Sequence, residues 1–245
     1  MKTNFLIKQM TENNSLDLYI YDDVKDDTVN WWADEVTESQ TSAKYIQSQL
    51  EVAKDVKNIN IYINSYGGSV KEGLSIYNQL KRHTAQKTVY VDGFACSIAS
   101  VIAMAGDKII MGGNTLMMVH RASMGAWGNA EELRRAANDI EVIDSASCSS
   151  YLAKAGDKLT QEKLNELLDG QTWLNAEQCL QYGLADEITG KEDKTITEAK
   201  QRFNLAMKHE MEQHKPDVKV PENLIVQQTN AEKLMAAFNK KTEVI

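Results

Sequence analysis

Two apolar stretches, each followed by a glycine-containing turn and then by a helical pattern, constrain the fold of this chain most strongly. The first covers residues 58–64, whose isoleucines alternate, and ends at residues 65–69 (Ser-Tyr-Gly-Gly-Ser). The second covers residues 88–91 and continues through Gly93 to Ser97, where a segment of small apolar residues begins. Strand, glycine turn and helix in this order are typical of parallel βαβ units, whose functional loops follow the carboxyl ends of the strands. The sequence therefore predicts an α/β fold.

Patterns on both sides of this pair extend the same architecture. Alternating apolar residues predict strands over 16–21, 108–111 and 116–120. Helical spacing and cap residues predict ordinary helices over 42–54, 69–83, 160–168 and 175–182, with Ser69 and Glu72 as a capping box. Another helix starts at Asn129 and keeps its spacing for about seven turns. Its apolar stripe is thin and rich in Ala and Ser, so we expect it to project into a neighbouring subunit.

Composition changes after Gly190, where the chain becomes strongly polar. Both prolines, Pro216 and Pro221, lie beyond this point, and only weak helical patterns accompany them. Such a segment buries too little apolar surface to form a core of its own. We therefore expect three parts: an amino-terminal lead over residues 1–14, a core domain over 15–189, and a polar, partly helical tail over 190–245.

Charge, hydropathy and cysteine spacing exclude several function classes. A net charge of −8 argues against a nucleic-acid surface, which needs clustered Lys and Arg. No stretch approaches the roughly 18 apolar residues of a membrane span, and the first apolar run is too short for a signal peptide. Cys96, Cys148 and Cys179 lack the spacing of a disulfide framework or a zinc site. We expect a cytoplasmic protein without membrane or nucleic-acid partners, and with no cofactor or metal.

Ser97 is the candidate for chemistry, because it lies where a predicted strand turns into a predicted helix. A serine nucleophile needs a base, an acid that orients the base, and amide donors for the oxyanion. His120 ends a predicted core strand and is the candidate base, while the amides of Gly68 and Ile98 are candidate oxyanion donors. The alternative is structural: Ser97 merely caps the helix and His120 is a core histidine with ordinary partners.

Four blocks of the sequence resemble, in order and spacing, the Clp protease proteolytic subunit family. They are residues 61–70 (Ile-Tyr-Ile-Asn-Ser-Tyr-Gly-Gly-Ser-Val), 93–99 (Gly-Phe-Ala-Cys-Ser-Ile-Ala), 118–120 (Met-Val-His) and 173–186, which opens with Trp-Leu-Asn-Ala-Glu. The resemblance covers about residues 15–189. The Leu-Tyr-Ile-Tyr opening, the Trp31-Trp32 pair and the long polar tail are most similar to the phage-encoded head-maturation branch.

This resemblance implies a fold, an assembly and an active site. The fold would be the crotonase-like (ClpP-type) superhelix of ββα units, and the subunits would stack as homo-oligomeric rings around a chamber that takes polypeptide substrates. Residues 125–128 and the long helix after them would form a handle that joins subunits. Ser97 would be the nucleophile and His120 the base.

The sequence departs from the family pattern at three places. Tyr66 stands where the family usually has proline, and Arg121-Ala122 stands where a proline follows the histidine. Gln171 occupies the position of the orienting acid. An amide cannot stabilise the imidazolium charge, and such a change costs a serine protease about 10⁴ in rate. We take Asp169, two residues earlier, as the third catalytic residue, and otherwise expect an impaired triad.

The sequence thus predicts a serine endopeptidase that cleaves scaffold or capsid proteins during phage head maturation in the host cytoplasm. The short lead predicts cleavage without a Clp ATPase. Two alternatives stay open: a catalytically impaired ring or scaffold protein, and a crotonase-type acyl-CoA enzyme. The acyl-CoA enzyme would share the fold and the oxyanion amides but would not need Ser97 and His120 at this spacing.

Overall fold

The structure, a computed structural model, describes residues 14–190 except 31, 33 and 34. Nearly all of the predicted lead and tail lies outside these residues, so the division into three parts stays a prediction. No helix in the described part of the chain has both the length and the apolar character needed to cross a membrane.

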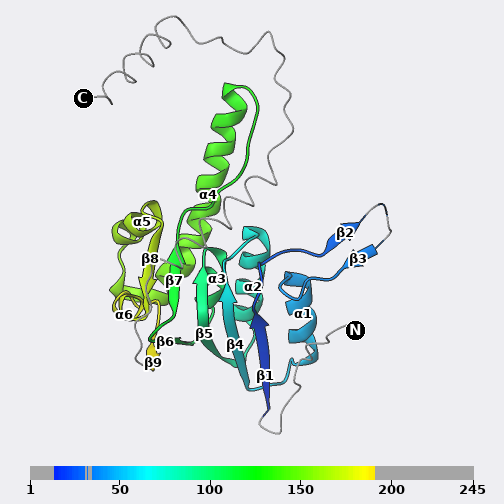
Figure 1. The fold of residues 1–245 in the computed structure, drawn as a ribbon, viewed down its shortest axis with the longest axis vertical. Helices are drawn as coiled ribbons and strands as arrows, with labels where there is room; N and C mark the ends of the chain where they lie inside the picture. The colour runs from blue at the N-terminus through cyan, green and yellow to red at the C-terminus, as the bar shows by residue number, and fades with distance from the viewer. Residues whose placement is uncertain (1–13, 31, 33–34, 191–245) are drawn as a thin grey trace, which may run out of the picture. The chain divides into compact units, whose positions relative to one another are not determined.

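A largely parallel sheet forms the centre of the described chain (Figure 1). Its main path runs through five parallel strands: β1 (Ser15–Ile20), β4 (Asn58–Ser65), β5 (Gln86–Cys96), β6 (Lys108–Gly112) and β9 (Glu187–Thr189). Two further strands, β7 (Leu116–Val119) and β8 (Thr172–Asn175), form a branch in which β7 is parallel to β5 and β8 is antiparallel to β7. A separate hairpin joins β2 (Thr28–Asn30) to β3 (Glu35–Thr37).

Strand β5 is long enough to take part in both the main path and the branch. Its first part pairs with β6 over Thr88–Val91, and its last part pairs with β7 over Phe94–Cys96. The two parts meet at Gly93, where an added Cβ would lie 2.4 Å from the Asn64 side-chain oxygen. Glycine therefore lets the strand pass close to β4 as it changes partner, and the end of β5 lies beside the end of β7.

Helices connect the strands and cover the sheet. They are α1 (Ala43–Val52), α2 (Val70–Arg82), α3 (Ile98–Ala103), α4 (Ala130–Ala155), the short 3₁₀ helix η1 (Gly156–Lys158), α5 (Gln161–Asp169) and α6 (Ala176–Gln181). Ser69 caps α2 as predicted. The Glu72 side chain does not complete the predicted capping box, because its buried carboxylate accepts the Ala43 N–H at 2.8 Å and so ties α2 to the start of α1.

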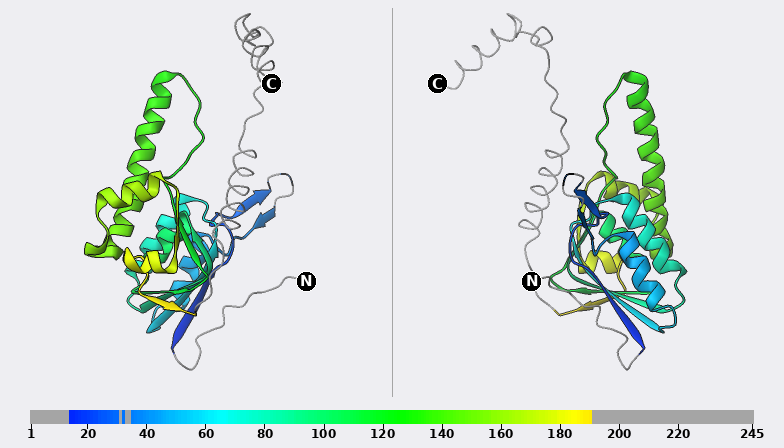
Figure 2. Two further views of the ribbon diagram at one scale, coloured as in Figure 1. Left: turned by 60° about the vertical axis from the view of Figure 1, so that its left-hand side comes forward. Right: turned by 90° about the vertical axis from the view of Figure 1, so that its right-hand side faces the viewer.

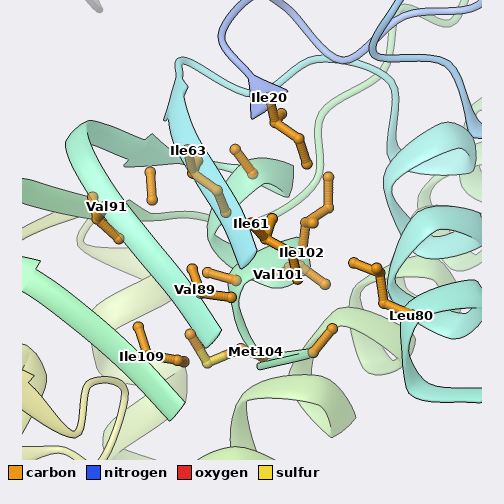
Figure 3. Close-up of a cluster of buried hydrophobic side chains, with 14 of the residues drawn as sticks. Ile20, Ile61, Ile63, Leu80, Val89, Val91, Val101, Ile102, Met104 and Ile109 are labelled. Carbon is orange, nitrogen blue, oxygen red and sulfur yellow. The ribbon is translucent and has the colours of Figure 1, made fainter. Parts of the chain in front are cut away.

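The two faces of the sheet differ in character. Alternate residues of β4 and β5 point into the core, where they meet α2 and α3. Figure 3 shows Ile61, Ile63 and Val89 from the strands with Leu80 from α2 and Ile102 from α3. On the other face, the paired residues Tyr19, Tyr62 and Tyr90 stack with ring centroids 4.8 and 5.1 Å apart. Helix α3 is buried throughout, which explains its small apolar residues. The predicted α/β fold is confirmed.

Helix α4 projects beyond the sheet, as the views in Figure 2 show. Asn129 and Glu132 form a capping box at its start, as in the prediction of a helix beginning there. Its amino-terminal half exposes Leu133 and Val142, whereas its last turns bury Cys148 and Tyr151 against the core. The helix is therefore anchored at one end only.

Replacing Gly73 tests the close contact between α2 and α3. An added Cβ would lie 2.1 Å from Cγ1 of Ile98, so Gly73→Ala must displace that side chain. We expect the free energy of unfolding, measured in urea, to fall by about 1–3 kcal/mol despite the better helix propensity of alanine. The control is Lys81→Ala at an exposed position of α2, which should change it by less than about 0.5 kcal/mol. A Gly73→Ala protein as stable as the wild type would contradict this packing.

Candidate active site

Ser97 occupies a sharp turn between β5 and α3. Its backbone has φ 52° and ψ −128°, a conformation that L-residues rarely adopt and that costs on the order of 1–3 kcal/mol. Its N–H donates to the Met118 carbonyl at 2.8 Å, which holds the turn against β7. The Ser97 side chain makes no capping hydrogen bond to α3, so the interpretation of this serine as a mere helix cap is wrong.

His120 reaches Ser97 because β7 pairs with the last part of β5. Cys96 and Met118 are partners in the ladder, so the residues that follow each strand come together. His120 Nε2 lies 2.7 Å from Ser97 Oγ, a hydrogen-bond distance at which the ring can take the hydroxyl proton. The structure thus brings together the predicted nucleophile and the predicted base.

The surroundings of His120 favour its neutral form. Burial lowers the pKa of His120 below its ordinary value of 6.5, and this effect outweighs the Asp144 charge and a hydrogen bond with the Arg121 backbone, which both raise the pKa. A neutral imidazole at neutral pH is the form that can accept a proton. The neighbouring Cys96 is no competing nucleophile, since burial raises the pKa of its thiol.

The Gly67-Gly68 turn lies directly against the Ser97 turn. A Cβ on Gly67 would come within 2.7 Å of Ser97 Cβ and 3.2 Å of the Ile98 nitrogen, and both glycines have positive φ. Within the described residues, the amides of Gly68 and Ile98 donate no hydrogen bond to the chain. Their proximity and free N–H groups fit an oxyanion hole, which stays a prediction for this site.

A buried pair of hydroxyls holds the Ser97 turn from behind. Ser100 Oγ donates to the Ser97 carbonyl at 2.5 Å and lies 2.6 Å from the hydroxyl of Tyr151 on α4. Because the Ser100 proton is committed to Ser97, Tyr151 is the donor of this pair. Neither Ser100 nor Tyr151 was predicted from the sequence to support the site. The available signal was a lone serine in the otherwise apolar helix α3.

The structure places Asp169 and Gln171, the two candidates for the third member of the triad, on either side of Gly170. Asp169 ends α5, where its carboxylate accepts Arg121 Nε at 2.8 Å and its side chain is 64% exposed. That guanidinium holds the pKa of Asp169 below its usual value. Gln171 is exposed. It directly precedes Thr172, which pairs with Val119 in the antiparallel ladder, so Gln171 is level with His120. The role of Asp169 as the orienting acid stays a prediction.

A polar cleft of about 670 Å³ lies next to this site. It is bounded by the end of β7, the middle of α4 and helix α5, through the residues Arg121, Glu141, Asp144, Ser145, Cys148, Ser149, Gln161, Asn165 and Asp169. Asp144 was not predicted as a site residue from the sequence. An aspartate in the Ala- and Ser-rich stripe of the long helix, where a carboxylate needs a partner, was the only signal for it.

Replacing Tyr151 tests the support behind Ser97. Tyr151→Phe keeps the buried ring but leaves Ser100 Oγ without its donor, so we expect the free energy of unfolding to fall by about 1 kcal/mol. We also expect Ser97 to react a few times more slowly with a fluorophosphonate, roughly two- to fivefold. The measurements are urea unfolding and the labelling rate followed by intact mass. Tyr182→Phe is the control, and an equal effect there would contradict the role of Tyr151.

The pH dependence of Ser97 labelling tests the surroundings of His120. The base must be neutral to accept the serine proton, and burial lowers its pKa from 6.5. The labelling rate should therefore stay high as the pH falls to 6.5 and reach half of its maximum only below that value. A half-maximal rate at or above pH 6.5 would show that burial does not dominate the pKa.

Comparison with known proteins adds an independent line of evidence. A family model described as Clp protease matches residues 17–192. An ATP-dependent Clp protease proteolytic subunit of Ligilactobacillus salivarius is 32% identical over 172 residues, which cover 69% of this chain and 86% of that protein. Proteins of the same name from Bacteroides fragilis and Deinococcus radiodurans are 30% and 34% identical and cover 60% and 57% of this chain, or 72% and 68% of their own lengths.

The family match begins within β1 and covers every later strand and helix through β9. It includes both turns that meet at Ser97 and the strand that ends at His120. The chain therefore belongs to the Clp protease family and is a homologue of its proteolytic subunits.

Proposed function

We propose that this protein is a serine endopeptidase of the Clp proteolytic-subunit type. The observation that carries the proposal is the 2.7 Å contact between Ser97 Oγ and His120 Nε2 at the strained end of β5. The family relationship supports the same conclusion.

The proposed reaction follows from the positions of these groups. His120 Nε2 takes the proton as Ser97 Oγ attacks the peptide carbonyl, and the amides of Gly68 and Ile98 donate to the oxyanion. The imidazolium then protonates the leaving amine, and water releases the acyl group in a second cycle. The sequence predicts Asp169 as the acid of this cycle, although its side chain is 64% exposed and pairs with Arg121.

The oligomer is part of the proposal, because α4 exposes apolar side chains that a partner would cover. Leu133, Val142 and Ile143 on α4, with Met124 and Trp127 on the segment before it, are 37–70% exposed. Apolar groups gathered on one projecting element are typical of an association surface. We propose that this handle joins subunits into rings that enclose the Ser97 sites.

The most specific part of the proposal concerns the substrate and the need for an ATPase. The Trp pair and the long polar tail resemble the phage head-maturation branch, which supports scaffold or capsid proteins as substrates. We propose cleavage of flexible polypeptides without an ATPase. The relatives carry the name ATP-dependent, so digestion of an unfolded substrate without nucleotide is the deciding assay.

Covalent labelling tests the peptidase. We expect a fluorophosphonate to add one mass increment to the assembled wild type and none to Ser97→Ala. Ser48→Ala, at an exposed serine of α1, is the matched control and should label as the wild type does. An oligomeric wild type that neither labels nor cleaves peptides would overturn the proposal and favour the alternative of a non-catalytic ring protein.

A further inference from the structure

We propose that Asp144, on the handle helix α4, is the positioning acid of the Ser97–His120 pair. It fixes the backbone that follows His120 and places a negative charge near the imidazole. This inference rests on the proposed peptidase function and names a residue that the sequence analysis did not consider.

The carboxylate of Asp144 is held against the two residues that follow His120. Its Oδ1 accepts the Ala122 N–H at 2.6 Å, and its Oδ2 lies 4.0 Å from Arg121 Nε. The side chain is only 13% exposed. A largely buried carboxylate that accepts a charge-assisted hydrogen bond from the backbone keeps its neighbours in place. Asp144 thus ties the chain after β7 to α4.

Asp144 is also the carboxylate whose charge acts on the ring. It raises the pKa of His120 against the lowering effect of burial. When the proton moves from Ser97 Oγ to Nε2, the ring becomes a cation that the nearby negative charge stabilises. The other ionisable groups that line the same cleft are Arg121, Glu141, Cys148 and Asp169.

Asp169 is less suited to this electrostatic role. Its carboxylate is 64% exposed, and it pairs with the Arg121 guanidinium at 2.8 Å. Solvent screening and the adjacent positive charge both weaken its field at a distance. Asp144 has one fifth of that exposure and lies farther from Arg121, so more of its charge acts on His120.

The sequence around the site is consistent with this assignment. Residue 122 is alanine, whose N–H makes the contact with Asp144, and a proline there would have no N–H to donate. Residue 171, level with His120, is a glutamine and carries no charge. The charge that the imidazolium needs must therefore come from another element.

The same face of α4 supports both members of the pair. Tyr151 lies seven residues after Asp144, which is about two helical turns and returns to the same side of the helix. Tyr151 supports the Ser97 carbonyl through Ser100, while Asp144 supports the chain after His120. The position of one helix thus sets both the nucleophile and the base.

The experiment compares Asp144→Asn with Asp169→Asn. Asparagine keeps an oxygen that can accept the Ala122 N–H, so Asp144→Asn removes the charge with little change of shape. We expect the fluorophosphonate labelling rate of Ser97 to fall roughly tenfold or more, and by less than about threefold in Asp169→Asn. The control for the helix is Asp139→Asn, an exposed position of α4, which should label at the wild-type rate.

Two pH readouts separate positioning from a merely structural role. Loss of the negative charge should lower the pKa of His120, so the acidic limb of the labelling profile should move to lower pH in Asp144→Asn only. The His120 ring titration, followed by NMR in Ser97→Ala with and without Asp144→Asn, measures the same shift without any catalysis. It therefore tests the inference even if the proposed peptidase activity fails.

Each outcome either supports or overturns the assignment. A His120 pKa that falls in Asp144→Asn and stays unchanged in Asp169→Asn supports the assignment. An unchanged pKa and labelling rate in Asp144→Asn, or the larger effect in Asp169→Asn, overturns it. An equal loss of rate in Asp139→Asn would attribute the effect to the helix as a whole and would also overturn it.

Discussion

The change of partner along β5 is the constraint on which the site depends. The first part of the strand is bound by β4 and β6 in the core, and its last part pairs with β7. Backbone hydrogen bonds to strands on both sides fix the direction of β5 where it ends at Cys96. Ser97 is the next residue. Because β7 is parallel to this part of β5, His120 ends up 2.7 Å from the serine. The ladder thus sets the geometry of the pair, and the strain at Ser97 is sustained by the hydrogen bonds around it.

Helix α4 links that geometry to the part of the molecule that projects. Its buried end supplies Tyr151 behind the Ser97 turn, and its middle holds Asp144 against the chain that follows His120, while its far end exposes apolar side chains. A shift of the helix along its axis would move both supports together. In the oligomer that we propose, contacts made by the handle would therefore influence the alignment of serine and histidine.

The residues of the site were predicted from the sequence better than the side-chain contacts that support them. Ser97, His120 and the Gly67-Gly68 turn were identified because each follows a predicted strand, and in parallel sheets these ends meet. Ser100 and Tyr151 were missed because their contact spans 51 residues and neither fits a local pattern. Asp144 was missed for the same reason. Glu72 shows the opposite error: the local pattern predicted a capping box, but its carboxylate accepts the Ala43 N–H instead.

The alternation of strands and helices, the two glycine turns and the residues available for chemistry could be predicted from the sequence, since they depend on neighbours within a few positions. The positions of the carboxylates could not, because they depend on tertiary packing. Asp169 is closer in sequence to the expected position, yet it pairs with Arg121 near the solvent, whereas Asp144 on α4 binds the chain that follows His120. The field at a histidine depends on distance and burial, and both are set by the packing of elements that are remote in sequence.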